Sequence, residues 1–327
     1  NKRREFGDAT NPNDTELYFD LNTFNYNVRY NLKESKNWET SFGIGGMQQS
    51  NTNKGLEALI PDYNFFDVGA FVYTQKKFNE NLTLAGGLRF DNRNVDSKEM
   101  LEDSDVKFSK FNKNYNGISG SLGLSYQMNP QSTLKVNLSR GFRAPNIAEL
   151  ASNGVHEGTF KYELGDINLK SEISHQIDVA YFLNSDHITF EFTPFINFIS
   201  NYIYTEKLQD ANGNDVIIDP SNPVPAFKFT QGNAQLFGGE IFVDIHPHPF
   251  DWLHLENSFS YVRATQNNRA DNEKFLPFIP APKYRGEIKA QYKEVNDTFS
   301  EFYAKFSVDH YFKQNSIFSA FDTETST

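Results

Sequence analysis

The stretch LKVNLSRGFRAPNIAEL, residues 134–150, decides the fold because its pattern changes halfway along. Its first half places leucine or valine at every second position, which is typical of a strand with one apolar and one polar face. Gly141 and Pro145 end this alternation, and the segment NIAEL that follows is typical of a short helix. The stretch therefore predicts a strand over residues 132–142 that runs directly into a long polar loop, residues 143–171.

The same period of two recurs along the chain. It is clear in four further segments: 118–128, 188–204, 237–245 and 302–308. Several of these runs exceed the roughly 5–6 residues of an ordinary globular strand, and a strand that crosses a bilayer needs about 9–11 residues. The pattern predicts an all-β, antiparallel fold with strands long enough to span a membrane.

The connections alternate strictly between short and long. Short polar turns are predicted at residues 34–37, 79–81, 129–131, 184–186, 246–249 and 296–297. Long polar loops are predicted at residues 52–62, 97–114, 143–171, 209–225 and 267–282. Short turns at one end and long loops at the other are typical of outer-membrane β-barrels. We therefore expect a transmembrane β-barrel, with about a dozen strands in this chain.

Composition restricts the class of protein and its partners. The 327 residues carry a net charge of -11, which argues against nucleic acid as a partner. Cysteine is absent and no apolar run is long enough for a membrane helix. Aromatic residues make up 15% of the chain although the mean hydropathy is -0.61. Strands with one apolar and one polar face fit this balance of many aromatic residues and low mean hydropathy. The polar side chains would then line a water-filled or plugged lumen, and the apolar side chains would contact the lipids of the outer membrane.

Two motifs carry a resemblance to a known family. SRGFRAPNIAEL, followed by YELGDINLKSEISHQIDVAY, resembles the TonB-dependent outer-membrane receptors. The matching positions are Gly141, Phe142, Arg143, Ala144, Pro145, Glu149, Leu150, Asn168, Leu169 and Glu172. The sequence departs from the family pattern at Asp166 and Ile167, which stand where the family usually has Asn-Pro.

The resemblance implies a barrel of about 22 strands whose lumen is plugged by an N-terminal domain. Residues 1–327 are then part of a single receptor β-barrel domain, without the plug and without strands at both barrel ends. The chain starts at Asn1 and does not end on the aromatic residue expected of a complete barrel. TonB is expected to act through the missing N-terminal region, and the location is expected to be the bacterial outer membrane.

The resemblance also implies energy-dependent uptake of a scarce nutrient, with a ferric siderophore as the first expectation for the cargo. A haem or zinc receptor of the same family and a passive porin or structural barrel remain alternatives. No catalytic triad, nucleophile elbow or cofactor motif is present, so neither an enzyme nor a resident cofactor is predicted. A soluble carbohydrate-binding protein or an enzyme would have to bury Phe190, Phe192 and Phe198 in a closed core.

The loop over residues 143–171 holds the candidate ligand-binding residues, since it lies where an incoming ligand is first met. They are Arg143, Asn146, Glu149, His156, Glu157 and Tyr162. Arg143 has a functional interpretation, in which it binds an anionic ligand or orders the loop by pairing with Glu149. The alternative, a structural arginine at the barrel rim, is favoured because ion pairs at rims are common and weak. His156 is a weak candidate for a haem or zinc ligand, because no second histidine or cysteine is near it in sequence.

Two further groups of residues are assigned structural roles. The segment HPHP, residues 246–249, looks like a metal motif, but the alternation makes it a periplasmic turn. Aromatic residues near strand ends are expected to form the girdles at the membrane interfaces; examples are Tyr202, Tyr204, Phe227 and Tyr261.

Overall fold

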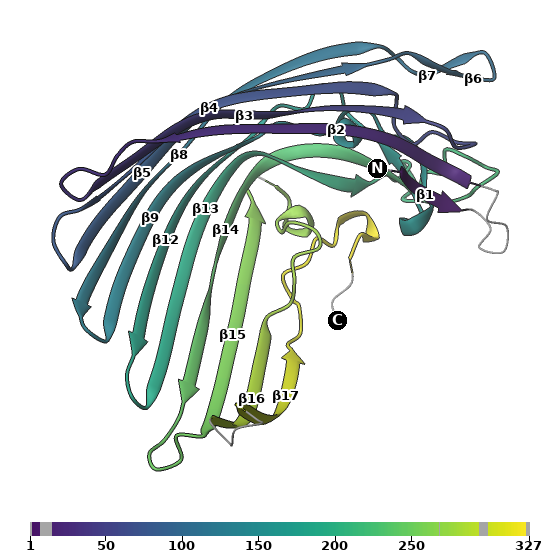
Figure 1. The fold of residues 1–327 in the computed structure, drawn as a ribbon. Helices are drawn as coiled ribbons and strands as arrows, with labels where there is room; N and C mark the ends of the chain where they lie inside the picture. The colour runs from purple at the N-terminus through teal and green to yellow at the C-terminus, as the bar shows by residue number, and fades with distance from the viewer. Residues whose placement is uncertain (1, 7–14, 268, 294–299, 325–327) are drawn as a thin grey trace.

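The computed structural model describes residues 2–6, 15–267, 269–293 and 300–324. One large antiparallel sheet dominates it and curls into part of a barrel wall (Figure 1). Its strands follow one another in chain order: β1 (Lys2–Phe6), β2 (Thr15–Asn31), β3 (Trp38–Asn53), β4 (Tyr63–Lys77), β5 (Leu82–Ser97), β8 (Phe111–Asn129), β9 (Ser132–Arg143), β12 (Glu172–Asn184), β13 (Ile188–Lys207), β14 (Ala226–Ile245), β15 (Leu253–Gln266), β16 (Lys283–Lys293) and β17 (Glu301–Tyr311).

The all-β antiparallel prediction is confirmed. Each strand of this order pairs antiparallel with the next, for example Leu122 opposite Leu138 and Leu138 opposite Ile177. The sheet order begins at β1 and ends at β17, so within the described residues the wall stays open. No helix of the described part is long and apolar enough to cross a membrane.

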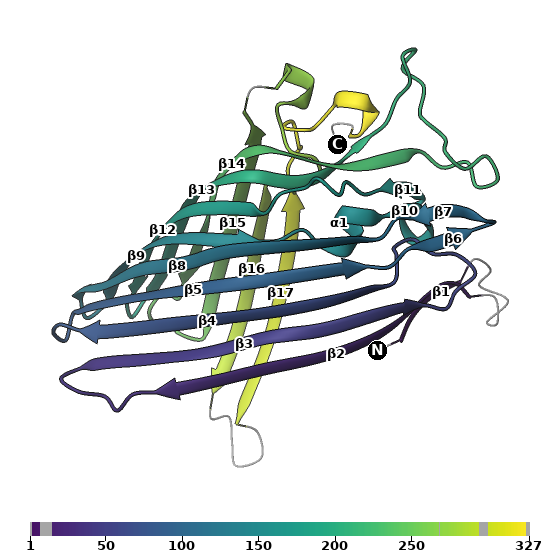
Figure 2. The same ribbon diagram turned by 90° about the horizontal axis from the view of Figure 1, so that it is seen from above.

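Short and long connections lie at opposite ends of the sheet, as predicted (Figure 1). The predicted turn at 296–297 lies outside the described residues. The long loops contain small elements that gather at their end of the wall (Figure 2). These are β6 (Met100–Glu102), β7 (Asp105–Phe108), α1 (Ile147–Ala151), β10 (Asn153–His156), η1 (Glu157–Thr159), β11 (Lys161–Leu164), η2 (Asp271–Glu273) and η3 (Ala320–Asp322).

The apolar face of the strands is exposed. Phe192 and Phe198 on β13 keep 41% and 46% of their accessible surface, and Phe190 is half-buried. Leu122 and Phe306 keep 50% and 68%. Large apolar side chains in such numbers on one face need an apolar solvent, and a soluble protein would cover them. The arrangement is that of a lipid-facing barrel surface and contradicts a closed soluble core.

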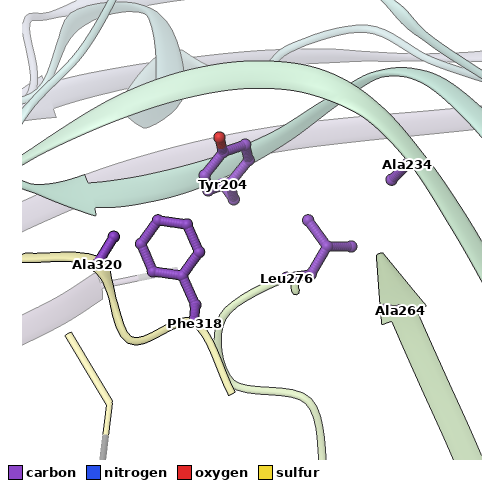
Figure 3. Packing of buried hydrophobic residues seen from close by; sticks show 6 residues of the cluster. All are labelled: Tyr204, Ala234, Ala264, Leu276, Phe318 and Ala320. Atoms are coloured by element: carbon purple, nitrogen blue, oxygen red, sulfur yellow. The ribbon is translucent and has the colours of Figure 1, made fainter. Parts of the chain in front are cut away.

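The buried cores lie where loops fold onto the sheet. One cluster joins Tyr204 and Ala234 to Leu276 and Phe318 of the loop segments, and Figure 3 shows Phe318 beneath Tyr204. Tyr204 and Phe227 are each only 7% exposed. The girdle prediction was therefore wrong for these two residues, because residues outside the strands of the barrel wall cover both side chains: Phe318 packs against Tyr204, and Lys161 of the long loop lies over the ring of Phe227.

Candidate functional site

The helix α1 begins the long loop after β9, and its capping is encoded locally. The Asn146 side chain accepts a hydrogen bond from the Glu149 amide at 2.9 Å, and the Glu149 carboxylate accepts one from the Asn146 amide at 2.8 Å. This reciprocal pair is a capping box, which satisfies donors that a helix start leaves free. Asn146 and Glu149 thus fix the first turn of α1 against the end of β9.

Arg143 ties this helix to the neighbouring strands. Its Nη1 donates to both carboxylate oxygens of Glu149, at 2.8 and 2.9 Å. Its Nε and Nη2 donate to the two oxygens of Glu172 at 2.6 and 2.7 Å, and Glu172 also accepts from the Ile203 amide at 2.7 Å. The ion pair of Arg143 with Glu149, which the sequence offered as one alternative, is present in the structure. Each of its three nitrogens is engaged, so the guanidinium orders the loop base.

The departure from the family motif at Asp166 has a local explanation. The Asp166 carboxylate accepts a hydrogen bond from the Asn168 amide at 2.8 Å, which is an Asx turn. The Asp166 amide donates to the Glu149 carbonyl at 2.9 Å, and Leu169 after the turn is buried. A hydrogen bond accepted by the aspartate side chain therefore forms the turn that a proline would otherwise favour.

Gly165 before this turn offers a first test of how tightly the loop packs. A methyl group added there would lie 2.3 Å from the Ala151 amide nitrogen and 2.5 Å from the Leu150 carbonyl carbon. We expect Gly165→Ala to lower the free energy of unfolding by about 1–3 kcal/mol and to increase proteolysis of the loop. Gly158→Ala is the matched control, since its nearest neighbour would be 3.9 Å away. Equal protease resistance of the two variants would contradict the packing described here.

Two adjacent hollows open beside the loop base and share Arg93. The first, about 170 Å³, is lined by Met47, Gln49, Tyr63, Phe65, Arg93, Val95, Pro145, Asn146 and Ile147. The second, about 230 Å³, is lined by Asp67, Asp91, Arg93, Phe142, Arg143 and Ala144. Arg93 makes a bidentate ion pair with Asp67, at 2.9 and 2.7 Å. The hollows therefore combine aromatic walls with charges that are already paired, an arrangement suited to contacting a ligand.

His156 and Tyr162 lie further along, on the hairpin of β10 and β11. His156 Nδ1 lies 3.1 Å from Glu163 Oε1, and its Nε2 lies 3.8 Å from Glu5 Oε1. Tyr162 donates to the Asn153 side chain at 2.9 Å, and burial raises the pKa of its hydroxyl. The side chain of Glu157 lies outside what the structure describes.

The structure thus divides five of the six candidates into two groups. Arg143, Asn146 and Glu149 form one hydrogen-bonded unit at the loop base, while His156 and Tyr162 belong to the hairpin. Sequence reasoning missed Arg93 and Asp67 as lining residues. Their signal was present as charged residues on the polar positions of β4 and β5, but only the register of these strands pairs them directly.

A curved antiparallel wall with an apolar outer face, short turns at one end and folded loops at the other defines a membrane β-barrel protein. The model of the family described as "TonB dependent receptor-like, beta-barrel" matches residues 1–326, and the chain belongs to this family. The family consists of outer-membrane proteins of Gram-negative bacteria, and the predicted family is confirmed.

Three similar proteins illustrate the relationship. The TonB-dependent heme receptor A of Haemophilus influenzae (strain 86-028NP) is 26% identical over 211 residues, 58% of this chain and 27% of that protein. The copper transporter OprC superposes with a TM-score of 0.74 at 16% identity, over 92% of this chain and 46% of OprC. The ferric yersiniabactin uptake receptor FyuA of Yersinia pestis superposes with a TM-score of 0.63 at 12% identity, over 95% of this chain and 45% of FyuA. The chain spans about a quarter of the receptor matched by sequence and less than half of either structure, and these two structural likenesses show the fold alone.

Proposed function

We propose that this chain is barrel wall of an outer-membrane receptor for TonB-dependent uptake of iron, and that haem is its cargo. The observation that carries the proposal is the sequence likeness to TonB-dependent heme receptor A over 58% of the chain. The sequence alone favoured a ferric siderophore, from the family as a whole. The plug, the segment that contacts TonB and the remaining strands are proposed to lie outside residues 1–327.

The geometry of His156 supports this cargo. A carboxylate only accepts hydrogen bonds, so the contact with Glu163 assigns the proton of the neutral ring to Nδ1 and leaves a lone pair on Nε2. A carboxylate partner of this kind orients a metal-ligating histidine and makes it more basic. Among the described residues Nε2 makes no hydrogen bond, and His156 is part-exposed at 25%. The imidazole is thus prepared to bind haem iron through Nε2.

The hollows at the loop base offer a second surface that the proposed haem could contact, besides His156. Their aromatic and aliphatic side chains, among them Tyr63, Phe65 and Ile147, can contact one edge of a flat apolar ring system, since a hollow of about 170 Å³ is smaller than a whole ligand pocket of about 300–1,000 Å³. Arg93 and Arg143 beside them are paired with carboxylates and order the wall. A ferric siderophore is the second candidate, because the family as a whole favours it.

The test is a binding titration of the full-length receptor in detergent. Hemin, a ferric catecholate, a ferric hydroxamate, Zn²⁺ and cobalamin are titrated separately, with His156→Ala and Glu163→Gln in parallel. We expect hemin to bind and His156→Ala to weaken it at least about tenfold, with a shifted Soret band, and Glu163→Gln to act more weakly. His310→Ala, on β17, is the matched histidine control.

Tight binding of a ferric chelate without hemin binding would overturn the haem proposal and leave the siderophore receptor. Hemin binding that is unchanged in His156→Ala would remove His156 from the site but retain the cargo. Growth on hemin as the iron source is compared with and without functional TonB. This comparison separates an active receptor from a passive porin, because only the active receptor loses hemin uptake when TonB is not functional.

A further inference from the structure

Two histidines and an aspartate meet at the short-turn end of the sheet, far along the strands from the loops. The pairing of β14 with β15 ends at Asp244 opposite Glu256 and Ile245 opposite Leu255. Just beyond it, the ring of His246 lies beside that of His254, with the centroids 5.3 Å apart. Asp244 and His246 are two residues apart on an extended chain and therefore share one face. Residues at even positions of β14 include buried Ala234, so the cluster lies on the face onto which the loops fold.

The three side chains are close enough to hold one ion. One ligand atom from each of Asp244, His246 and His254 lies within 4.8 Å of the others. His254 Nδ1 is 2.7 Å and His246 Nδ1 is 3.5 Å from the same oxygen, Asp244 Oδ2, and the two rings are 5.3 Å apart. Ligands at about 2.0–2.1 Å from a tetrahedral zinc ion are about 3.3 Å apart, so small side-chain movements suffice.

Two polar atoms of the cluster are buried and make no hydrogen bond among the described residues. Asp244 is only 8% exposed, and its Oδ1 makes no hydrogen bond among the described residues. His246 Nδ1 is likewise buried and without a hydrogen bond within the described part of the chain. A buried polar atom without a partner costs about 1–3 kcal/mol. A bound cation would satisfy both atoms at once, and the charge of Asp244 favours it.

The lysine paired with His254 does not occupy this position. Lys289 pairs with His254 across β15 and β16, and a lysine amine at the cluster would oppose a cation. Its Nζ instead lies over the ring of Tyr303, 5.5 Å from the ring centroid. The Glu256 carboxylate, on the residue paired with Asp244, adds negative charge to the same face.

We propose that Asp244, His246 and His254 form a binding site for a divalent transition-metal ion such as Zn²⁺. Two imidazoles and one carboxylate are a donor set that zinc accepts, with a fourth position left for water. On binding, the proton on His254 Nδ1 moves to Nε2, and the ion replaces the hydrogen bond to Asp244. The metal joins the end of β14 to the start of β15 and fixes the turn between them. The site is independent of the haem proposal and of the loops.

The test is a calorimetric titration of the full-length receptor with Zn²⁺ after treatment with a chelator, at neutral pH. We expect one ion per chain, and at least about tenfold weaker binding in His246→Ala, His254→Ala and the near-isosteric Asp244→Asn. His248→Ala is the matched control, since this exposed histidine lies in the same turn but pairs with Asp251 at 3.4 Å. The variant His156→Ala is added to distinguish Zn²⁺ bound at the proposed site from any Zn²⁺ bound by the β10–β11 hairpin.

A second readout guards against variants that fold poorly. The thermal midpoint of the wild type should rise with Zn²⁺ concentration, as it does for any ligand that binds only the folded state, and the midpoint of Asp244→Asn should stay constant. Zn²⁺ binding that persists unchanged in the His246→Ala/His254→Ala double variant would overturn the proposal. Absence of one-to-one binding by the wild type would overturn it equally.

Discussion

Replacing Leu122 by arginine is expected to destabilise the barrel by about 2–4 kcal/mol, the largest effect we expect from a single exposed side chain. Leu122 lies near the middle of β8, and half of its surface is accessible. In a soluble protein such a substitution would be nearly neutral. Here the side chain faces lipid hydrocarbon, where a guanidinium has no partner and must be desolvated or must thin the bilayer around it.

The matched control is Ser121→Arg, one residue earlier on the opposite face of the same strand. Both variants of the full-length receptor are unfolded by guanidinium chloride in lipid vesicles, and the free energies are compared with the wild type. We expect Ser121→Arg to stay within about 1 kcal/mol because its side chain reaches the polar lumen. Equal losses in the two variants would contradict the assignment of the faces.

Replacing Arg143 by alanine is expected to cost about 2–4 kcal/mol and to disorder the loop over residues 143–171. The substitution leaves Glu149 and Glu172, whose side chains are only 10% and 13% exposed, without their common cation. Removing one partner from a buried ion pair typically costs about 3–5 kcal/mol. The loss expected for Arg143→Ala is set below this typical cost because solvent screens the ion pairs, since the Arg143 side chain is itself 42% exposed.

Hydrogen exchange by mass spectrometry on the full-length receptor measures this effect locally. Protection should fall in α1 and in the β10–β11 hairpin, and it should be retained in β4 and β5. Arg143→Lys is the graded control, because an ammonium keeps the charge but cannot make two bidentate contacts, so an intermediate loss is expected. Unchanged protection in Arg143→Ala would show that the capping box alone holds the loop.

The strands, the turns and the family were predictable because each depends on residues close together in sequence. Alternation with a period of two fixes which side chains share a face, and the spacing of turns fixes which end of the sheet each connection occupies. The capping box of Asn146 and Glu149 was equally local. The position of Tyr204 was not predictable, because Phe318 covers it from more than a hundred residues away.

The sequence by itself determined the antiparallel sheet, its apolar and polar faces and the long loop that follows Arg143. Only the tertiary structure decided that His246, in an apparently ordinary turn, meets His254 of the next strand and Asp244 of its own. The physical reason is register. A strand carries its own periodicity in its sequence, but the partner that lies opposite each residue is set by the pairing of two strands, and a site built across that pairing has no signature in either strand alone.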